Sequence, residues 1–167
     1  MQASRSFHLL AHLVFFGCVA VIGGALLFQY AGGLAPCELC LYERWPYYAA
    51  IPVLLPMLHG PAARGDARLA AAILLLVFAA SGALAFYHVG VEFHWFAGPT
   101  ACTGSGPVAK TLEELQAQLM AQQPVRCDQP QFSFLGITLA GWNLVASAVL
   151  AAVALAALRA AAPGRRA

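Results

Sequence analysis

Two cysteines separated by two residues, in Cys37-Glu-Leu-Cys40, are the strongest local signal for chemistry in the sequence. This spacing lets two thiols meet as a disulfide when the second begins a helix, so that one thiol can attack and the other can resolve a mixed disulfide. Because Cys40 begins an apolar segment, we expect a helix N-terminus to favour its thiolate. The spacing also suits a metal site. Haem attachment is excluded, because Leu41 rather than histidine follows Cys40.

Two polar residues near the ends of predicted membrane spans are candidate binding groups. Arg44 follows Cys40 by four positions, which places both side chains on one face of a helix. An arginine in the outer turn of a membrane helix is costly and indicates function, although an interfacial arginine that pairs with Glu43 is a structural alternative. His88 lies just before a cysteine-bearing loop and is the second candidate. His94 is a weaker one.

Cys102 and Cys127 are far apart in that loop, and a disulfide between them is the simplest state. The spacing fits a structural and a catalytic disulfide equally, and four outer thiols permit three connectivities. A structural zinc site shared with Cys37 and Cys40 would call for a second close pair of cysteines, which is absent. Cys18 lies in an apolar stretch and is expected to be an inert packing residue.

The composition places these residues in a membrane protein. Of 167 residues, 61% are hydrophobic and 10% are charged, whereas a soluble domain averages about 25% charged residues. A soluble fold of this length could not bury so many apolar side chains. The net charge is +2 and no basic run alternates with aromatic residues, so we expect no nucleic-acid partner.

Four apolar stretches are long enough to cross a bilayer, which takes about 20 residues. We expect an all-α, integral membrane four-helix bundle that forms one domain over residues 1–167. The second stretch is weaker because it contains Glu43, Arg44 and three prolines, which a membrane helix tolerates where neighbouring helices satisfy the freed carbonyls. The stretches cover about 7–28, 41–59, 69–91 and 139–158.

Basic residues orient these four spans. They gather at the N-terminus, between the second and third spans, and at the C-terminal end. In a chain with four spans, these three places lie on the same side of the membrane. The positive-inside rule makes that side the cytoplasm, with both termini inside. The outer side then carries one long loop, about 92–136, and four cysteines; in a bacterium it is the periplasm, which permits disulfides. The basic residues are Arg5, Arg64, Arg68, Arg159, Arg165 and Arg166.

The outer loop contains a predicted helix of its own. Thr111-Leu-Glu-Glu114 has the form of a capping box. The apolar residues Val108, Leu112, Leu115 and Leu119 follow helical spacing. This pattern predicts a short amphipathic helix on the bilayer surface, and a solvated helix on the loop is the alternative.

At this point the sequence resembles the DsbB family, the bacterial disulfide bond formation protein B. The resemblance extends over nearly the whole chain, including the four predicted spans, the internal termini and a second loop cysteine at Cys127. Three segments carry it: Cys37-Glu-Leu-Cys40-Leu-Tyr-Glu-Arg44, Phe86-Tyr87-His88-Val-Gly-Val-Glu92 and Gly98-Pro-Thr-Ala-Cys102.

The resemblance implies an inner-membrane enzyme that keeps a soluble, DsbA-like periplasmic dithiol oxidase of the thioredoxin fold in its disulfide form. All four outer cysteines would then be catalytic. Cys102–Cys127 would oxidise the thiols of the partner, through a mixed disulfide at Cys102. Electrons would pass to Cys37–Cys40 and finally to a membrane quinone.

The resemblance also implies a quinone site. Cys40 would contact the quinone, with Arg44 and His88 beside it. Positive charge from Arg44 would stabilise a thiolate and a developing oxyanion in a medium of low dielectric constant. No metal is expected, and no residue favours ubiquinone over menaquinone.

Three other functions remain open. A membrane protein could bind zinc or another soft metal through its outer cysteines, for instance for transport. The disulfides could instead be structural and hold an outer loop on a membrane scaffold. A vitamin K epoxide reductase-like protein also joins a helical bundle to a CxxC pair, but Arg44 after this pair favours the DsbB family.

Overall fold

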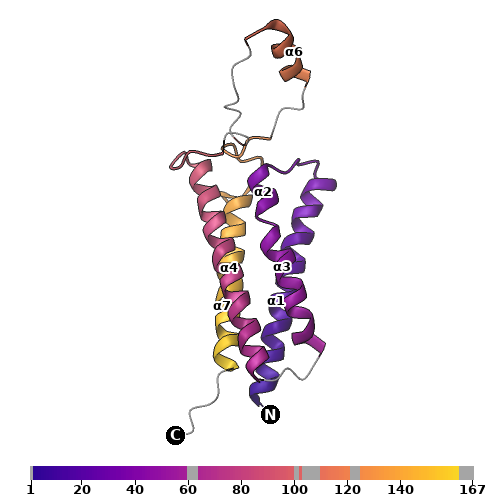
Figure 1. Ribbon diagram of the computed structural model, residues 1–167, viewed down its shortest axis with the longest axis vertical. Helices are drawn as coiled ribbons and strands as arrows, with labels where there is room; N and C mark the ends of the chain where they lie inside the picture. The colour runs from indigo at the N-terminus through magenta and orange to yellow at the C-terminus, as the bar shows by residue number, and fades with distance from the viewer. Residues whose placement is uncertain (1, 60–63, 100–101, 103–109, 121–124, 162–167) are drawn as a thin grey trace.

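Four helices run side by side in the computed structural model, which describes residues 2–59, 64–99, 102, 110–120 and 125–161. They are α1 (Gln2–Tyr30), α3 (Trp45–His59), α4 (Arg64–Glu92) and α7 (Leu139–Ala160). In Figure 1, α1 begins and α7 ends at the same end of this group, and the short helix α2 (Glu38–Tyr42) lies at the other. The described part of the chain is mostly helical, as the sequence predicts.

Three of these helices are long and apolar enough to cross a membrane, judged over the described residues. The qualifying segments are Ser6–Tyr30, Asp66–Glu92 and Leu139–Ala160, of 25, 27 and 22 residues. They match the first, third and fourth predicted spans. Helix α3 has 15 residues, which is shorter than the length that spans a bilayer. The fourth span therefore stays a prediction.

The second predicted stretch is not one continuous helix. It is divided into α2 and α3 by a turn at Glu43 and Arg44. Pro46 accounts for the break, because inside a continuous helix its ring would clash with the carbonyl of Tyr42 and its missing N–H would leave that carbonyl without a bond. At the start of α3, proline meets neither obstacle. The break turns α2 into a separate element that carries the CxxC pair.

Short elements lie at the end of the bundle where α2 lies. Strands β1 (Ser133–Phe134) and β2 (Ile137–Thr138) form an antiparallel hairpin that leads into α7. Helix α6 (Leu112–Met120) lies beyond this end of the bundle (Figure 1).

The predicted cap of α6 is half confirmed, because Glu114 N donates to Thr111 Oγ1 at 3.1 Å while the Glu114 carboxylate accepts from Lys110 N. Val108 lies outside the described residues. The predicted contact of α6 with the bilayer surface stays a prediction.

The bundle core is apolar and contains one chain of hydroxyl and amide groups. Cys18 is fully buried in this core and unpaired, as expected of a packing residue. Ser81 Oγ lies 2.9 Å from Ser147 Oγ, which lies 3.0 Å from the hydroxyl of Tyr47. The Tyr47 hydroxyl in turn donates to Asn143 Oδ1. These bonds link α3, α4 and α7 and fix the side-chain amide of Asn143 near the start of α7.

We predict that Gly90→Ala destabilises the protein by about 1–3 kcal/mol, as overpacking in a full core does. A Cβ at this position would overlap the ring of Phe96. That ring is 41% exposed but stacks on Tyr87 at 5.8 Å and packs against Phe86 at 6.1 Å, so moving it away would cost these two contacts. Gly23→Ala is the matched control, because a Cβ there meets nothing within 4 Å. Denaturation midpoints in detergent measure both, and equal midpoints for the two variants would contradict the expectation.

Candidate functional site

Cys37 and Cys40 form a disulfide at the start of α2, with their Cα atoms 5.0 Å apart. Cys37 is the N-cap residue of this helix, and its sulfur accepts a hydrogen bond from Cys40 N at 3.1 Å. Cys40 is the third residue of the helix, so the prediction that Cys40 opens it is wrong by two residues. The reason is that the helix begins directly after Pro36 and Cys37 rather than with the apolar run.

Cys102 and Cys127 form a second disulfide, as the simplest reading of the loop predicts. Their Cα atoms are 5.1 Å apart, and Cys127 N donates to the carbonyl of Cys102 at 2.9 Å. Both cysteines are buried. With Cys37, Leu39 and Val91 they form a second, smaller core at the α2 end of the bundle. This core brings both disulfides to one place.

A buried histidine lies between the CxxC pair and an acidic residue. His88 Nε2 is 3.7 Å from Cys37 Sγ, and His88 Nδ1 is 2.9 Å from Glu43 Oε1. Only 3% of His88 and 7% of Glu43 are exposed. A ring nitrogen of His88 also lies within 4.8 Å of Cys127 Sγ. His88 thus joins α4 to the turn after α2 and to the loop.

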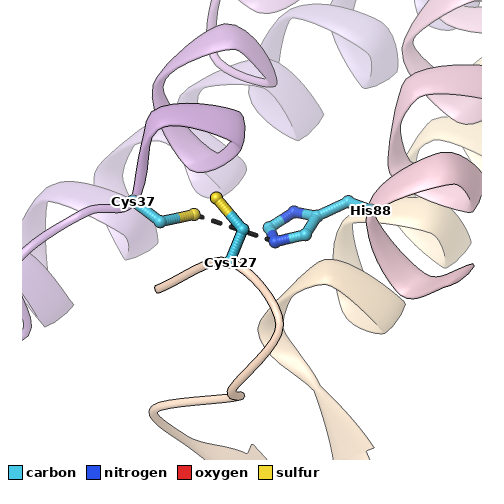
Figure 2. A group of neighbouring side chains, drawn as sticks. All are labelled: Cys37, His88 and Cys127. Carbon is cyan, nitrogen blue, oxygen red and sulfur yellow. Dashed lines mark hydrogen bonds between the residues drawn. The ribbon is translucent and has the colours of Figure 1, made fainter. Parts of the chain in front are cut away.

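The two disulfides come close enough for their sulfurs to exchange partners. Donor atoms of Cys37, His88 and Cys127 all lie within 4.8 Å of one another. Figure 2 shows these side chains converging from the start of α2, from α4 and from the loop. A small movement would therefore bring Cys127 Sγ into bonding range of Cys37 Sγ.

A salt bridge stands directly beside Cys127. Arg126 Nε donates to Asp128 Oδ1 at 2.9 Å. This hydrogen bond lowers the pKa of the Asp128 carboxyl. The two charges flank Cys127 in sequence and balance each other.

A cavity of about 400 Å³ opens next to the CxxC pair. Its walls come from the C-terminal half of α1, the α2–α3 junction, the start of α7 and the loop segment that follows Cys127. Most of the lining is apolar. The residues with chemical groups relevant to binding are Cys37, Cys40, Glu43, Arg44, Tyr47, His88, Glu92, Arg126, Cys127 and Asn143.

Two polar groups in this cavity have defined orientations. Arg44 donates to Gln29 Oε1 at 2.7 Å, so the alternative in which Arg44 pairs with Glu43 is not what the structure has. Asn143 Nδ2 is buried and has no hydrogen-bond partner among the described residues. An unpaired buried donor is costly in a protein interior. Asn143 is therefore ready to donate to an acceptor on a bound molecule.

The structure brings together most of the residues singled out from the sequence. Cys40, Arg44 and His88 line the same cavity, and Cys37 and Cys127 border it. His94 is exposed and does not line it. Cys102 is bonded to Cys127 but is also absent from its walls.

Two residues of the site were not singled out by the sequence. Glu43 was considered only as a partner of Arg44, but it orients His88. Asn143 was overlooked in the last apolar stretch. The signal was available for both, because an acidic or amide side chain within a membrane segment is itself a sign of function.

Comparisons with known proteins identify one family. The family model described as "Disulfide bond formation protein DsbB" matches residues 7–157. Disulfide bond formation protein B of Aromatoleum aromaticum is 34% identical over 145 residues, covering 83% of this chain and 84% of the relative. Disulfide bond formation protein B 1 of Pseudomonas fluorescens strain Pf0-1 is 33% identical over 143 residues, covering 81% and 80%. No solved structure matches the chain.

We predict that Cys102→Ala rearranges the remaining disulfide. The thiol of Cys127 is then free, and its thiolate can attack Cys37 Sγ and release Cys40, because the two sulfurs lie within 4.8 Å. Maleimide labelling and peptide mass spectrometry in a Cys18→Ala background should find a Cys37–Cys127 bond and a labelled Cys40. The rate of exchange should rise with pH, because the thiolate of Cys127 is the attacking species.

The matched control is Cys127→Ala in the same background. It frees Cys102, whose sulfur is not part of the group within 4.8 Å, so Cys40 should stay bonded. An intact Cys37–Cys40 disulfide and a labelled Cys127 in the Cys102→Ala variant would refute the exchange.

Proposed function

Because this chain belongs to the DsbB family of disulfide bond formation proteins, we propose that it reoxidises a DsbA-like periplasmic dithiol oxidase and passes the electrons to a membrane quinone. The observation that carries the proposal is the approach of Cys127 to Cys37 within 4.8 Å, beside a cavity that contains Cys40 and Arg44. This arrangement joins one disulfide in the outer loop to another at the edge of an apolar site.

The proposal includes a location and a topology. The protein is placed in the bacterial inner membrane with four spans, α3 being the short one, and with both termini in the cytoplasm. The end of the bundle that carries the disulfides faces the periplasm, and the basic ends of the chain face the cytoplasm.

The first proposed step is thiol–disulfide exchange with the partner. A thiolate of the partner attacks Cys102 and forms a mixed disulfide, while Cys127 leaves as a thiolate. The second thiol of the partner then displaces Cys102. The partner gains a disulfide, and this chain gains two electrons and two protons as the Cys102 and Cys127 thiols.

The second step moves this reduction inward. The Cys127 thiolate attacks Cys37 Sγ, and the bond from Cys37 to Cys40 breaks. Cys102 then attacks Cys127, which restores the loop disulfide and releases Cys37. The dithiol now belongs to Cys37 and Cys40, and no external oxidant has been needed.

His88 and Glu43 supply proton control. His88 Nε2, at 3.7 Å from Cys37 Sγ, can take the thiol proton as Cys37 becomes a thiolate. The carboxylate of Glu43, bonded to Nδ1 at 2.9 Å, stabilises the resulting imidazolium. Since both groups are buried, the interaction is little screened by water.

The residues present fit a quinone. A volume of about 400 Å³ lies within the usual range for small-molecule sites. Arg44 and the unpartnered Nδ2 of Asn143 are donors for carbonyl oxygens, and the apolar residues of α1 and α7 suit a lipid-soluble molecule. A bound quinone supplies a two-electron acceptor that leaves as hydroquinone. Cys40 is one of three cysteines on the cavity wall, and it is the thiol that we propose reacts with the quinone.

Replacing either cysteine of the CxxC pair by serine is expected to abolish quinone reduction. The electrons of the partner would then have no dithiol adjacent to the cavity. The measurement is an anaerobic assay of quinone reduction driven by a reduced DsbA-like protein, with Cys40→Ser, Cys37→Ser and the control Cys18→Ser. Activity retained in both CxxC variants would rule out the relay.

Asn143→Leu is expected to weaken quinone binding by about 2- to 10-fold, the value of one hydrogen bond. The substitution keeps a similar volume and removes the free donor together with Oδ1, the acceptor for Tyr47, which keeps Ser147 as a partner. Quinone titration, monitored by quenching of Trp142, which lines the cavity, measures affinity directly. Thiol exchange with the partner should not change.

Gln116→Leu on α6 is the matched control for this variant, because it removes an exposed amide outside the cavity. Equal quinone affinity in the Asn143→Leu variant and the wild type would remove Asn143 from the site.

A further inference from the structure

Three soft metal-binding atoms converge where the two disulfides meet. Donor atoms of Cys37, His88 and Cys127 lie within 4.8 Å of one another, and all three residues are buried. In the oxidised protein both sulfurs are bonded to other cysteines and are poor ligands. We propose that reduction of both disulfides turns this cluster into a Zn²⁺ site, and that the ion reversibly blocks the reduced protein.

The spacing is close to what zinc requires. Zinc–sulfur bonds of about 2.3 Å and zinc–nitrogen bonds of about 2.0–2.1 Å in a tetrahedron put neighbouring ligand atoms roughly 3.5–3.8 Å apart. Cys37 Sγ and His88 Nε2 are 3.7 Å apart. Cys127 Sγ must approach by no more than about 1 Å, and a reduced side chain is free to rotate towards the other two.

His88 is already oriented as a metal ligand. Its Nδ1 bonds to Glu43 Oε1 at 2.9 Å, which directs Nε2 towards Cys37. Carboxylate–histidine–zinc arrangements of this kind fix the ring and raise the basicity of the nitrogen that binds.

Charge balance also favours the ion in this buried place. Binding displaces one proton from each of the Cys37 and Cys127 thiols, so that two thiolates balance the charge of one Zn²⁺. No oxidation or reduction accompanies this step. The Glu43 carboxylate adds one negative charge, which faces the cation through the ring of His88. These three ligands leave a fourth tetrahedral position, for which the Cys40 thiol, freed from Cys37 by reduction, is available.

The ion would occupy both sulfurs that exchange in the proposed relay. Zinc would therefore stop electron transfer between the loop cysteines and the CxxC pair until it dissociates. Only this inhibition rests on the proposed function. Binding itself needs nothing more than a chemical reductant.

The decisive experiment compares oxidised and reduced wild-type protein, purified in detergent without quinone. Co²⁺ serves as a spectroscopic probe, and added Zn²⁺ should displace it. We expect one equivalent bound to the reduced protein, with the absorption of a tetrahedral sulfur-ligated ion, and none bound to the oxidised protein. Equal binding in both states, or none in either, would overturn the proposal.

Variants then identify the ligands. His88→Gln and Cys127→Ser should abolish stoichiometric binding. Glu43→Gln should weaken zinc affinity about 10- to 100-fold, the usual effect of losing a carboxylate that bonds to a ligand histidine. The controls are Cys18→Ser, which removes the remaining thiol of the bundle core, and His94→Asn, which removes an exposed histidine at positive φ that asparagine tolerates. Unchanged affinity in the Glu43→Gln and His88→Gln variants would refute the site.

The quinone assay separates this proposal from the proposed function. Zinc binding to reduced protein that lacks quinone reductase activity would leave the metal site in place and refute only the relay. Quinone reduction that is insensitive to zinc at saturating occupancy would refute the block.

Discussion

The hydrogen bond between Glu43 and His88 is the contact on which the arrangement of the cysteines depends. A carboxylate and an imidazole are rarely buried together at the end of a bundle unless each satisfies the other, because an unpaired buried charge is costly. The bond holds the turn after α2 against α4, and α2 carries Cys37. The same imidazole lies within 4.8 Å of the sulfurs of Cys37 and Cys127. One side chain therefore sets the distance between two disulfides that are remote in sequence.

The helices were predictable where hydropathy alone decides. Three long apolar segments match α1, α4 and α7 because a lipid-facing helix must satisfy its backbone internally and cover itself with apolar side chains. The second stretch was harder, since its apolar residues continue across the turn at Glu43 and Arg44. Pro46 marks the interruption, and giving more weight to its clash with the preceding turn would have placed the break correctly.

The site was predictable in its residue types and less so in its contacts. Spacing identified the CxxC pair, and the cost of polar groups in a membrane identified Arg44 and His88. The partner of His88 could not be derived, because it depends on how α4 is rotated relative to a turn distant in the chain. The orphaned amide of Asn143 follows from the hydrogen bond that Tyr47 makes across the bundle, which only tertiary structure defines.

The loop segment that carries Cys127 also walls the cavity. Phe132 packs on Phe28 of α1, and Gln131 donates to the carbonyl of Ala35 at 2.8 Å, so this stretch lies over the outer side of the cavity. A displacement of Cys127 would pull on that cover. In the proposed relay, the kinetics of the two half-reactions are then linked mechanically as well as by electrons. Such linkage favours an alternating, ping-pong order of turnover, in which the loop completes its exchange before the acceptor side completes its own.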